Sequence, residues 1–269
     1  GIYCFNGKLL RQALKKIDDD NAQGEFYITD VVGILRDEGY KVGAYVVEDS
    51  TEIHGINSRI QLAFSEGIMR KRINETHMLN GVTFINPDNT YIEEGVVVGS
   101  DTIIYPGVNI EGNTKIGEDC IIRSNSRIVN SQIGDKVEIE SSLIEDSIVE
   151  SSATIGPNAH LRPSSHIGKN VHIGNFVEVK NSIIEENSKA GHLAYIGDAI
   201  VGKDVNIGCG VIFANYNGKD KQITKVGNNV FIGSNSNLVA PIEIKDRVYI
   251  AAGSTITKDI EEGTLSIAR

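Results

Sequence analysis

Residues 155–174 read IGPNAHLRPSSHIGKNVHIG and place an aliphatic residue at every sixth position. The same spacing begins at Ile92 and continues, with interruptions, to Ile256. Neither an α-helix nor a single strand has a period of six residues. A repeat of this length is typical of a hexapeptide β-helix, in which each repeat supplies a short strand and a turn and three repeats close one coil. The side chains predicted to stack inside the coils are Ile92, Val98, Ile104, Ile110, Ile116, Ile122, Ile128, Ile133, Ile155, Leu161, Ile167, Ile173, Val179, Val226, Ile232, Leu238, Ile244, Ile250 and Ile256.

The residues from 92 onward suffice for about ten coils, which would form a mainly β prism about 45–50 Å long. Three stretches break the period. Between 133 and 155 the spacing compresses through Leu143, Ile144 and Ile148, which predicts an irregular coil. Between Val179 and Ile207 two steps shorten to five residues. The third break, residues 214–225, contains the turn sequence Asn-Tyr-Asn-Gly and predicts an exposed loop.

Before the ladder, apolar residues recur at helical spacing. This spacing predicts helices over residues 10–17 and 28–35, and residues 41–47 are predicted to form a strand. Ser58 is a candidate cap for a longer helix that ends near His77 and packs through Ile60, Phe64 and Ile68. Residues 1–80 are therefore expected to be a partial α/β domain, and residues 81–269 the β-helix.

Composition excludes several classes of partner. The formal net charge is −10, which argues against a broad nucleic-acid or anionic membrane surface. No apolar run approaches the length of a membrane span, and no signal-peptide pattern is present. The three cysteines, Cys4, Cys120 and Cys209, are widely spaced and odd in number, which argues against a disulfide framework and favours the cytoplasm.

Arg162 and Lys180 each follow a ladder residue and are separated by one uninterrupted coil. They should therefore lie side by side, where like charges are unfavourable unless an anion bridges them. A phosphate clamp is one interpretation. Two solvated surface bases are the alternative, and the spacing alone does not decide between them.

Four histidines require separate treatment. His160, His166 and His172 are six residues apart, so they should lie on three different sides of the prism and cannot bind one metal ion. His192 lies among the shortened steps and could act as a general base, although a lone histidine is usually structural. Glu178 and Tyr195 should stack in neighbouring coils near it, and a carboxylate beside a histidine can fix its tautomer.

Three motifs together resemble one enzyme family. They are Gly174–Lys180 (GNFVEVK), Lys189–Ala199 (KAGHLAYIGDA) and Asn215–Gly218 (NYNG). They resemble the acetyltransferase half of the bifunctional bacterial UDP-N-acetylglucosamine pyrophosphorylase and glucosamine-1-phosphate N-acetyltransferase. Residues 21–30 (NAQGEFYITD) and 55–59 (GINSR) are similar to the last part of that family's nucleotidyltransferase domain.

The resemblance implies a left-handed β-helix, a cytoplasmic homotrimer with active sites between subunits, and acetyl-CoA as the co-substrate. It implies that His192 is the general base and Glu178 its orienting partner. The residues implied to hold the sugar phosphate are Arg162, Lys180, Tyr195 and Asn206. The residues implied to lie at the acetyl-CoA site are Cys209, Asn215, Tyr216, Lys221, Ser234, Ala252 and Arg269.

The implied reaction is direct acetyl transfer to the amine of glucosamine 1-phosphate, in the pathway to UDP-N-acetylglucosamine and peptidoglycan, with backbone N–H groups near Cys209 holding the oxyanion. Asn57 is the one residue that matches the family's Mg²⁺ site, and its other role is at the entry to the helix after Ser58. The glycine-rich nucleotide loop of the family would precede Gly1, so uridylyl transfer is not expected of these residues. The family usually carries a short tail after the position of Arg269.

Three other readings stay open. The β-helix could be an appendage of a sugar nucleotidyltransferase, which would not need the set of His192, Tyr195, Asn206 and Lys221. It could be purely structural, but polar residues should then repeat evenly rather than cluster at the breaks. It could also belong to another hexapeptide acyltransferase, which a comparison of glucosamine 1-phosphate with serine and other amines would distinguish.

Overall fold

The computed structural model describes residues 2–268 and divides into two compact units, Gly1–Glu66 and Gly67–Arg269. The first unit contains helices α1 (Gly7–Ala13) and α2 (Asp30–Asp37) and the short 3₁₀ helix η1 (Ser50–Ile53). Asn6 caps α1 by accepting a hydrogen bond from the Lys8 amide at 3.0 Å. The small core of this unit confirms both predicted helices; its buried members are Ala13, Val31 and Leu35.

The predicted strand at residues 41–47 is wrong. The described residues of this segment form no strand, and Val42, Tyr45 and Val46 are exposed. A strand is stable only when its backbone groups pair with a neighbour, and no strand is described anywhere within residues 2–66. Local β-propensity is therefore insufficient in this segment.

The long helix predicted after Ser58 is confirmed as α3 (Arg59–Leu79). The Ser58 hydroxyl accepts the Gln61 amide at 3.2 Å, as expected of a cap. The predicted packed face is wrong, because Ile60 and Phe64 are exposed. Within the second unit, α3 instead buries Asn74 and His77, and the Asn74 side chain donates to the carbonyls of Pro87 and Thr90.

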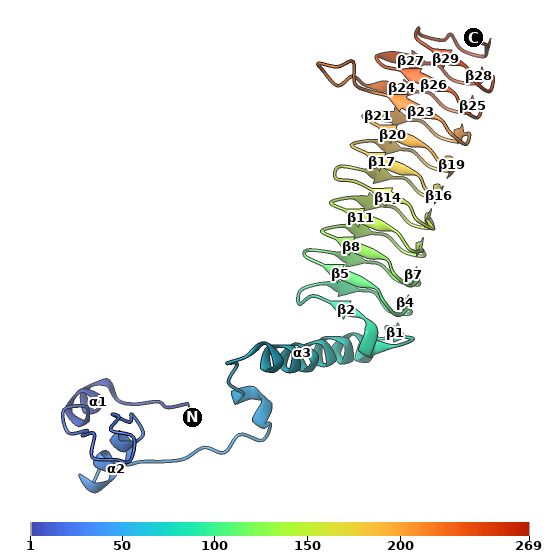
Figure 1. The fold of residues 1–269 in the computed structure, drawn as a ribbon. Coiled ribbons are helices and arrows are strands. Elements are labelled where there is room, and N and C mark those ends of the chain that lie inside the picture. Colours follow the sequence, from blue (N-terminus) through green and yellow to red (C-terminus); the bar gives the residue numbers. More distant parts are fainter. Residues whose placement is uncertain (1, 269) are drawn as a thin grey trace. The chain divides into compact units, whose positions relative to one another are not determined.

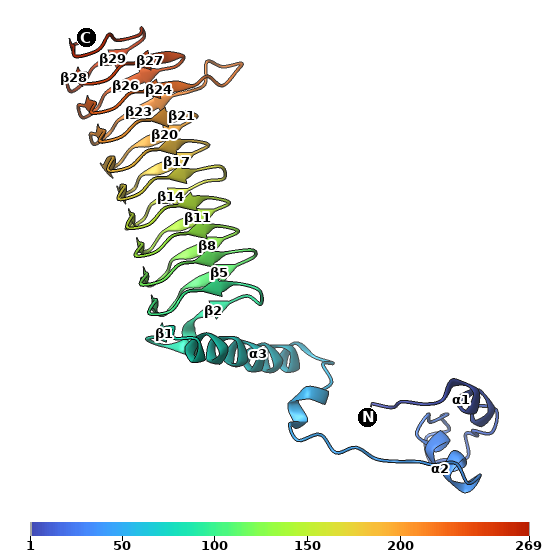
Figure 2. The ribbon, with the colours of Figure 1, turned by 180° about the vertical axis from the view of Figure 1, so that it is seen from behind.

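The second unit is a parallel β-helix, and its short strands stack from coil to coil in both views (Figures 1 and 2). The first sheet contains β1 (Thr83–Phe84), β4 (Ile103–Ile104), β7 (Ile121–Ile122), β10 (Glu138–Ile139), β13 (Thr154–Ile155), β16 (His172–Asn175), β19 (Lys189–His192), β22 (Asn206–Ile207), β25 (Phe231–Ile232), β28 (Tyr249–Ile250) and β30 (Leu265–Ser266). The second sheet contains β2 (Tyr91–Ile92), β5 (Asn109–Glu111), β8 (Arg127–Val129), β11 (Leu143–Glu145), β14 (His160–Leu161), β17 (Glu178–Lys180), β20 (Tyr195–Gly197), β23 (Ile212–Ala214), β26 (Asn237–Val239) and β29 (Thr255–Ile256). The third sheet contains β3 (Val97–Val98), β6 (Lys115–Ile116), β9 (Gln132–Ile133), β12 (Ile148–Val149), β15 (His166–Ile167), β18 (Ile183–Ile184), β21 (Ala199–Val201), β24 (Thr224–Val226) and β27 (Ile242–Ile244). A second 3₁₀ helix, η2, spans Pro87–Asn89.

The core of the β-helix is the predicted aliphatic ladder. Every ladder residue predicted to point inward is buried, from Ile92 to Ile256. Because the strands pair in parallel with matched register, each inward residue lies over its counterpart in the next coil, as Leu161 does over Val179. The hexapeptide β-helix predicted from the sequence is confirmed.

The irregular coil predicted for residues 133–155 is wrong. Ile139, Ile144 and Val149 are fully buried and belong to regular strands of the three sheets. These three residues follow one another at intervals of five residues instead of six, and the turn between the strands is one residue shorter. Ser141 and Asp146, at the corners, have φ of 44° and 43°, a conformation that short polar side chains tolerate.

Between β23 and β24 the chain leaves the stack as a loop, residues 215–223, which projects from the prism (Figure 1). An isolated antiparallel bridge joins Tyr216 to Lys221 within it. The Asn217 side chain accepts the amides of Lys219 and Asp220, which forms the turn at its tip. The exposed loop predicted at this break is confirmed, and we call it the 215–223 loop.

Candidate active site

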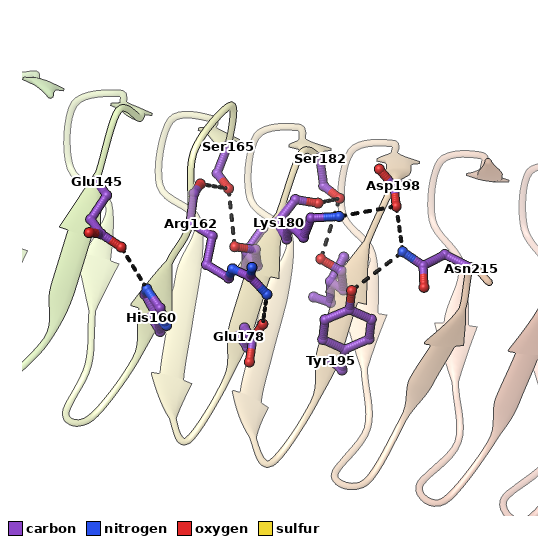
Figure 3. Close-up of polar contacts among 12 residues, drawn as sticks. Glu145, His160, Arg162, Ser165, Glu178, Lys180, Ser182, Tyr195, Asp198 and Asn215 are labelled. Carbon is purple, nitrogen blue, oxygen red and sulfur yellow. Dashed lines mark hydrogen bonds and ion pairs between the residues drawn. The ribbon is translucent and has the colours of Figure 1, made fainter. Parts of the chain in front are cut away.

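The two predicted clamp residues lie side by side in consecutive coils of the second sheet (Figure 3). Leu161 pairs with Val179, so Arg162 and Lys180, the residues that follow them, are neighbours. Glu178 pairs with Tyr195, and Lys180 with Gly197. A side chain at Gly197 would collide with Tyr195 and Asn215. The register predicted from the coil length is therefore confirmed.

Each of the two cations is matched by a carboxylate. A guanidinium nitrogen of Arg162 lies 2.8 Å from Glu178 Oε1, and this hydrogen bond raises the pKa of Arg162. Lys180 Nζ lies 3.6 Å from Asp198 Oδ2. The like charges are thus partly balanced without a ligand, and both side chains are held in place.

A third cation reaches the same place from the 215–223 loop. The side chain of Lys221 lies against that of Lys180, and this contact lowers the pKa of Lys221, with a further contribution from the charge of Arg162. The Lys221 contact and, after it, the Asp198 carboxylate raise the pKa of Lys180. Three convergent basic groups can bind a phosphate that balances their charge.

Asp198 is a member of this cluster that the sequence analysis gave no role. It is 6% exposed, and its carboxylate accepts hydrogen bonds from the side chains of Asn181, at 2.6 Å, and Asn215. Burial alone would raise its pKa, but these hydrogen bonds and the charges of Lys180 and Lys221 lower it overall. The available signal was its alignment with Asn181 at the same corner of the preceding coil.

His192 lies at the end of β19, in the first sheet, and its side chain is exposed. Glu178 begins β17 in the second sheet, and its carboxylate bonds to Arg162. Among the hydrogen bonds of residues 2–268, none joins Glu178 to His192. His192 and Glu178, which were predicted to act as a pair, therefore lie on either side of the corner between the first and second sheets.

The corner that contains His192 also gathers three of the residues implied to contact acetyl-CoA: Cys209, Ser234 and Ala252. The amide of Gly210 donates to Leu193, that of Asn235 donates to Cys209, and that of Gly253 donates to Ser234. These bonds stack the corner from coil to coil, and its solvent-facing positions are His192, Cys209, Ser234 and Ala252. Cys209 is a half-buried free thiol. Arg269 lies outside the described residues.

Three other predicted site residues lie apart from this corner. Tyr195 is in the second sheet, with its hydroxyl 3.4 Å from the Asn215 side-chain nitrogen. Asn206 is in the first sheet, as its position in the repeat predicted. Tyr216 is exposed, and its hydroxyl donates to the Gly218 carbonyl at 2.7 Å.

The other three histidines of the repeats lie where the period predicted, on three different sheets: His160 in β14, His166 in β15 and His172 in β16. His160 and His166 contact Glu145 and Glu150, and burial lowers the pKa of His172, with smaller effects from His192 and Lys189. Residues 2–268 contain no group of three or more His, Cys, Asp or Glu side chains placed to hold a metal ion.

Asn57 is placed just before α3, where its backbone N–H donates to the Gln61 side chain at 2.6 Å. With the Ser58 cap, this bond resembles the reciprocal capping arrangement at the start of a helix. A structural role at the helix entry therefore accounts for the contact that Asn57 makes.

No helix within residues 2–268 is both long enough and apolar enough to cross a membrane.

Two family models match the chain. "Bacterial transferase hexapeptide (six repeats)" matches residues 95–130 and 223–258, and "GMPPB C-terminal domain" matches residues 143–218. Among solved structures, the UDP-N-acetylglucosamine acyltransferase from Campylobacter jejuni is 20% identical, covers 67% of this chain and 70% of its own, and has a TM-score of 0.34. That TM-score is too low for the likeness to support a conclusion.

Curated relatives match all of the chain. "Bifunctional protein GlmU" of Clostridioides difficile is 60% identical over 269 residues, and that of Clostridium botulinum (strain ATCC 19397 / Type A) is 54% identical over the same length. In both cases the match covers 100% of this chain and 59% of the relative. These matches confirm the resemblance that the sequence motifs indicated: the whole of this chain is similar to part of the bifunctional bacterial pyrophosphorylase and acetyltransferase GlmU.

Proposed function

We propose that the chain transfers an acetyl group from acetyl-CoA to the 2-amine of glucosamine 1-phosphate and so forms N-acetylglucosamine 1-phosphate. The observation that carries this proposal is the convergence of Arg162 and Lys180, from neighbouring coils of the second sheet, with Lys221 of the 215–223 loop. The β-helix that carries them belongs to a chain that is similar to GlmU along its whole length. The cluster suits a phosphate, and the neighbouring corner carries an exposed histidine.

The phosphate of the sugar would lie across Arg162 and Lys180, with Tyr195 and Asn206 contacting the sugar. Charge-assisted hydrogen bonds from a guanidinium and an ammonium are among the stronger polar contacts in proteins. On binding, the phosphate would compete with Glu178 and Asp198 for these two cations. This competition favours a ligand with more negative charge than one carboxylate.

His192 would act as the general base. As the amine nitrogen attacks the thioester carbon, His192 accepts a proton from that nitrogen, and the carbonyl oxygen becomes an oxyanion held by backbone N–H groups near Cys209. Collapse of the tetrahedral intermediate breaks the C–S bond and releases coenzyme A as the leaving group. No covalent enzyme intermediate is required, so Cys209 needs no role as a nucleophile. Glu178 is the proposed orienting partner, a contact that would form only with a changed arrangement, since its carboxylate bonds to Arg162 within the chain.

Acetyl-CoA would lie along the corner that His192, Cys209, Ser234 and Ala252 share, with Asn215, Tyr216 and Lys221 of the loop and Arg269 as the other proposed contacts. The proposed assembly is a homotrimer with sites between subunits, and the placement of Tyr195 and Asn206 on different sheets supports it. Sedimentation should give a mass near three times 29.2 kDa. An active monomer would contradict the trimer.

The cellular location and the uridylyl transfer of the longer relatives are also proposals. The cytoplasm is the proposed location. Uridylyl transfer with Mg²⁺, for which Asn57 is the matching residue, is proposed only for the longer proteins that this chain resembles.

The function is tested by measuring coenzyme A release with a thiol reagent from acetyl-CoA and one of three acceptors: glucosamine 1-phosphate, glucosamine or serine. The expected result is release that depends on glucosamine 1-phosphate and is much weaker with the other two amines. Folded protein that releases no coenzyme A with glucosamine 1-phosphate, or that prefers serine, would overturn the proposal.

A further inference from the structure

Asp198 lies where the 215–223 loop leaves the β-helix, and none of the proposed catalytic steps uses it. Its backbone carbonyl accepts the amide of Thr224, the first residue after the loop, at 3.2 Å. Its carboxylate accepts a hydrogen bond from the side chain of Asn215, the first residue of the loop. One residue is therefore bonded to both ends of the loop that carries Lys221.

The same carboxylate is bonded to the body of the β-helix. Asn181 Nδ2 lies 2.6 Å from one of its oxygens. Lys180 Nζ lies 3.6 Å from the other oxygen (Figure 3). The residue is only 6% exposed. A buried carboxylate is tolerated when it is paired and hydrogen-bonded, and these contacts restrict it to one position. A carboxylate fixed in this way also fixes the ammonium that it contacts.

We infer that Asp198 is a positioning residue: it holds Lys180 and the two ends of the 215–223 loop in the single arrangement that directs Lys180 and Lys221 at a phosphate. The inference rests on the proposed function for the identity of the sugar phosphate. Asp198 itself would not bind the phosphate, because like charges repel.

Removing Asp198 should change the phosphate affinity in opposite directions if the residue positions the cations or if it acts only through its charge. A negative charge beside three cations weakens the attraction for an anion, so if Asp198 acted only through its charge, its removal would tighten phosphate binding. If Asp198 positions the cations, its removal would weaken phosphate binding, because Lys180 and the loop would lose their fixed geometry. The substitution Asp198→Asn keeps the size of the side chain and removes the charge.

Asp146 offers a matched control. It occupies the same corner between the second and third sheets, with φ of 43° against 51° for Asp198. Its amide donates to Val129 and its carbonyl accepts from Ser164, as the amide of Asp198 donates to Lys180 and its carbonyl accepts from Thr224. Asp146, however, is exposed, and no loop leaves the stack after it. Asp146→Asn therefore repeats the chemical change in the same backbone setting without the cluster.

The experiment compares three proteins: wild type, Asp198→Asn and Asp146→Asn. Calorimetry measures the affinity for inorganic phosphate and for glucosamine 1-phosphate, kinetics measure KM and kcat, and limited trypsin digestion measures cleavage after Lys221. Asp198→Asn should weaken both affinities by roughly tenfold or more, raise KM more than it lowers kcat, and speed cleavage. Asp146→Asn should match wild type in every measurement. Tighter or unchanged binding by Asp198→Asn, or equal effects of the two variants, would overturn the inference.

One further variant keeps the result decisive. If thermal melting shows that Asp198→Asn is unfolded, Asn181→Ala is measured instead, because it keeps the carboxylate and removes one of its donors. It should change affinity and cleavage in the same direction but less, and wild-type values would overturn the inference.

Phosphate binding and trypsin cleavage do not depend on acetyl transfer. Wild-type protein without turnover, but with the expected difference between variants, would therefore overturn the proposed function and leave the positioning role standing.

Discussion

The β-helix departs from its six-residue period in two regions, and the departures have different consequences. In the region from Ile128 to Val149 the short steps leave all inward residues buried, and the corner at Asp146 is open to solvent. In the region from Val179 to Val226 the inward residues at the short steps, Ile184 and Val201, are equally buried. Here, however, the 215–223 loop leaves the stack, and Asp198 is buried beneath it. A step that is one residue shorter changes only a turn, whereas an inserted loop places additional side chains next to a corner of the β-helix.

The comparison indicates where chemistry can develop in a repeat protein. Each coil contacts only its neighbours, so a shortened turn is accommodated locally by a corner residue with positive φ. An inserted segment adds side chains that belong to no ladder. In this chain it adds Asn215 and Lys221 beside Lys180 and Arg162, and a regular surface becomes a cluster of cations.

The largest effect is expected for His192→Ala, which should lower kcat by roughly 10²–10⁴-fold with little change in KM, as for a lost general base. The control is His166→Ala, which removes an imidazole from the third sheet, where it contacts Glu150. Steady-state kinetics on both variants test whether function is confined to the second region. Near-normal kcat in His192→Ala would remove this residue from the mechanism.

Truncation of the core tests whether the first region is as well packed as the second. Ile144→Ala and Ile196→Ala each remove a fully buried side chain and should each cost about 2–5 kcal/mol in the free energy of unfolding. Denaturant melts monitored by circular dichroism measure both. A much smaller cost at Ile144 would show that the shortened steps loosen the first region.

The clamp is expected to give a smaller effect. Arg162→Ala and Lys180→Ala should each weaken binding of glucosamine 1-phosphate by about 1.5–3 kcal/mol, the size of a charge-assisted hydrogen bond, and should leave the binding of glucosamine unchanged. Arg127→Ala is the control, since Arg127 makes a similar pair with Glu111 in an earlier coil. Equal losses for both ligands in calorimetry would indicate a structural role instead.

The smallest effect concerns pH. The pKa of Lys221 is lowered by its contact with Lys180, so the charge of Lys221 is lost as the pH rises through that lowered value. Phosphate affinity should therefore fall by a few fold in the alkaline range before an ordinary lysine titrates. In Lys221→Arg this fall should disappear, because arginine stays charged, while Lys203→Arg should behave as wild type. A wild-type affinity that is constant up to pH 10 would contradict the coupling.

The periodic sequence predicted most of the fold, because a fixed coil length determines both burial and register. It placed Leu161 over Val179 and distributed three histidines over three sheets. It failed at residues 133–155, where a shortened step was interpreted as an irregular coil although the same step at Ile184 was interpreted correctly. It also failed at residues 41–47, because strand formation depends on a partner that local sequence does not reveal.

The candidate site was less predictable for a different reason. Lys180 and Tyr195 lie in regular strands and Arg162 directly follows one, so the period located them. The burial of Asp198 depends on the path of the 215–223 loop, and no periodicity describes that path. His192 and Glu178 are close in the repeat but are separated by a corner, and the direction of a side chain at a corner depends on backbone angles that residue spacing does not encode.

The most direct test of the account is a crystal structure of this chain with glucosamine 1-phosphate. The account predicts that the phosphate lies within hydrogen-bond distance of Arg162 and Lys180, beside the 215–223 loop, while Asp198 keeps its bonds to Asn181 and Asn215. A phosphate bound elsewhere on the β-helix, or one that contacts neither cation, would contradict the central claim that the inserted loop and the second sheet together form the sugar-phosphate site.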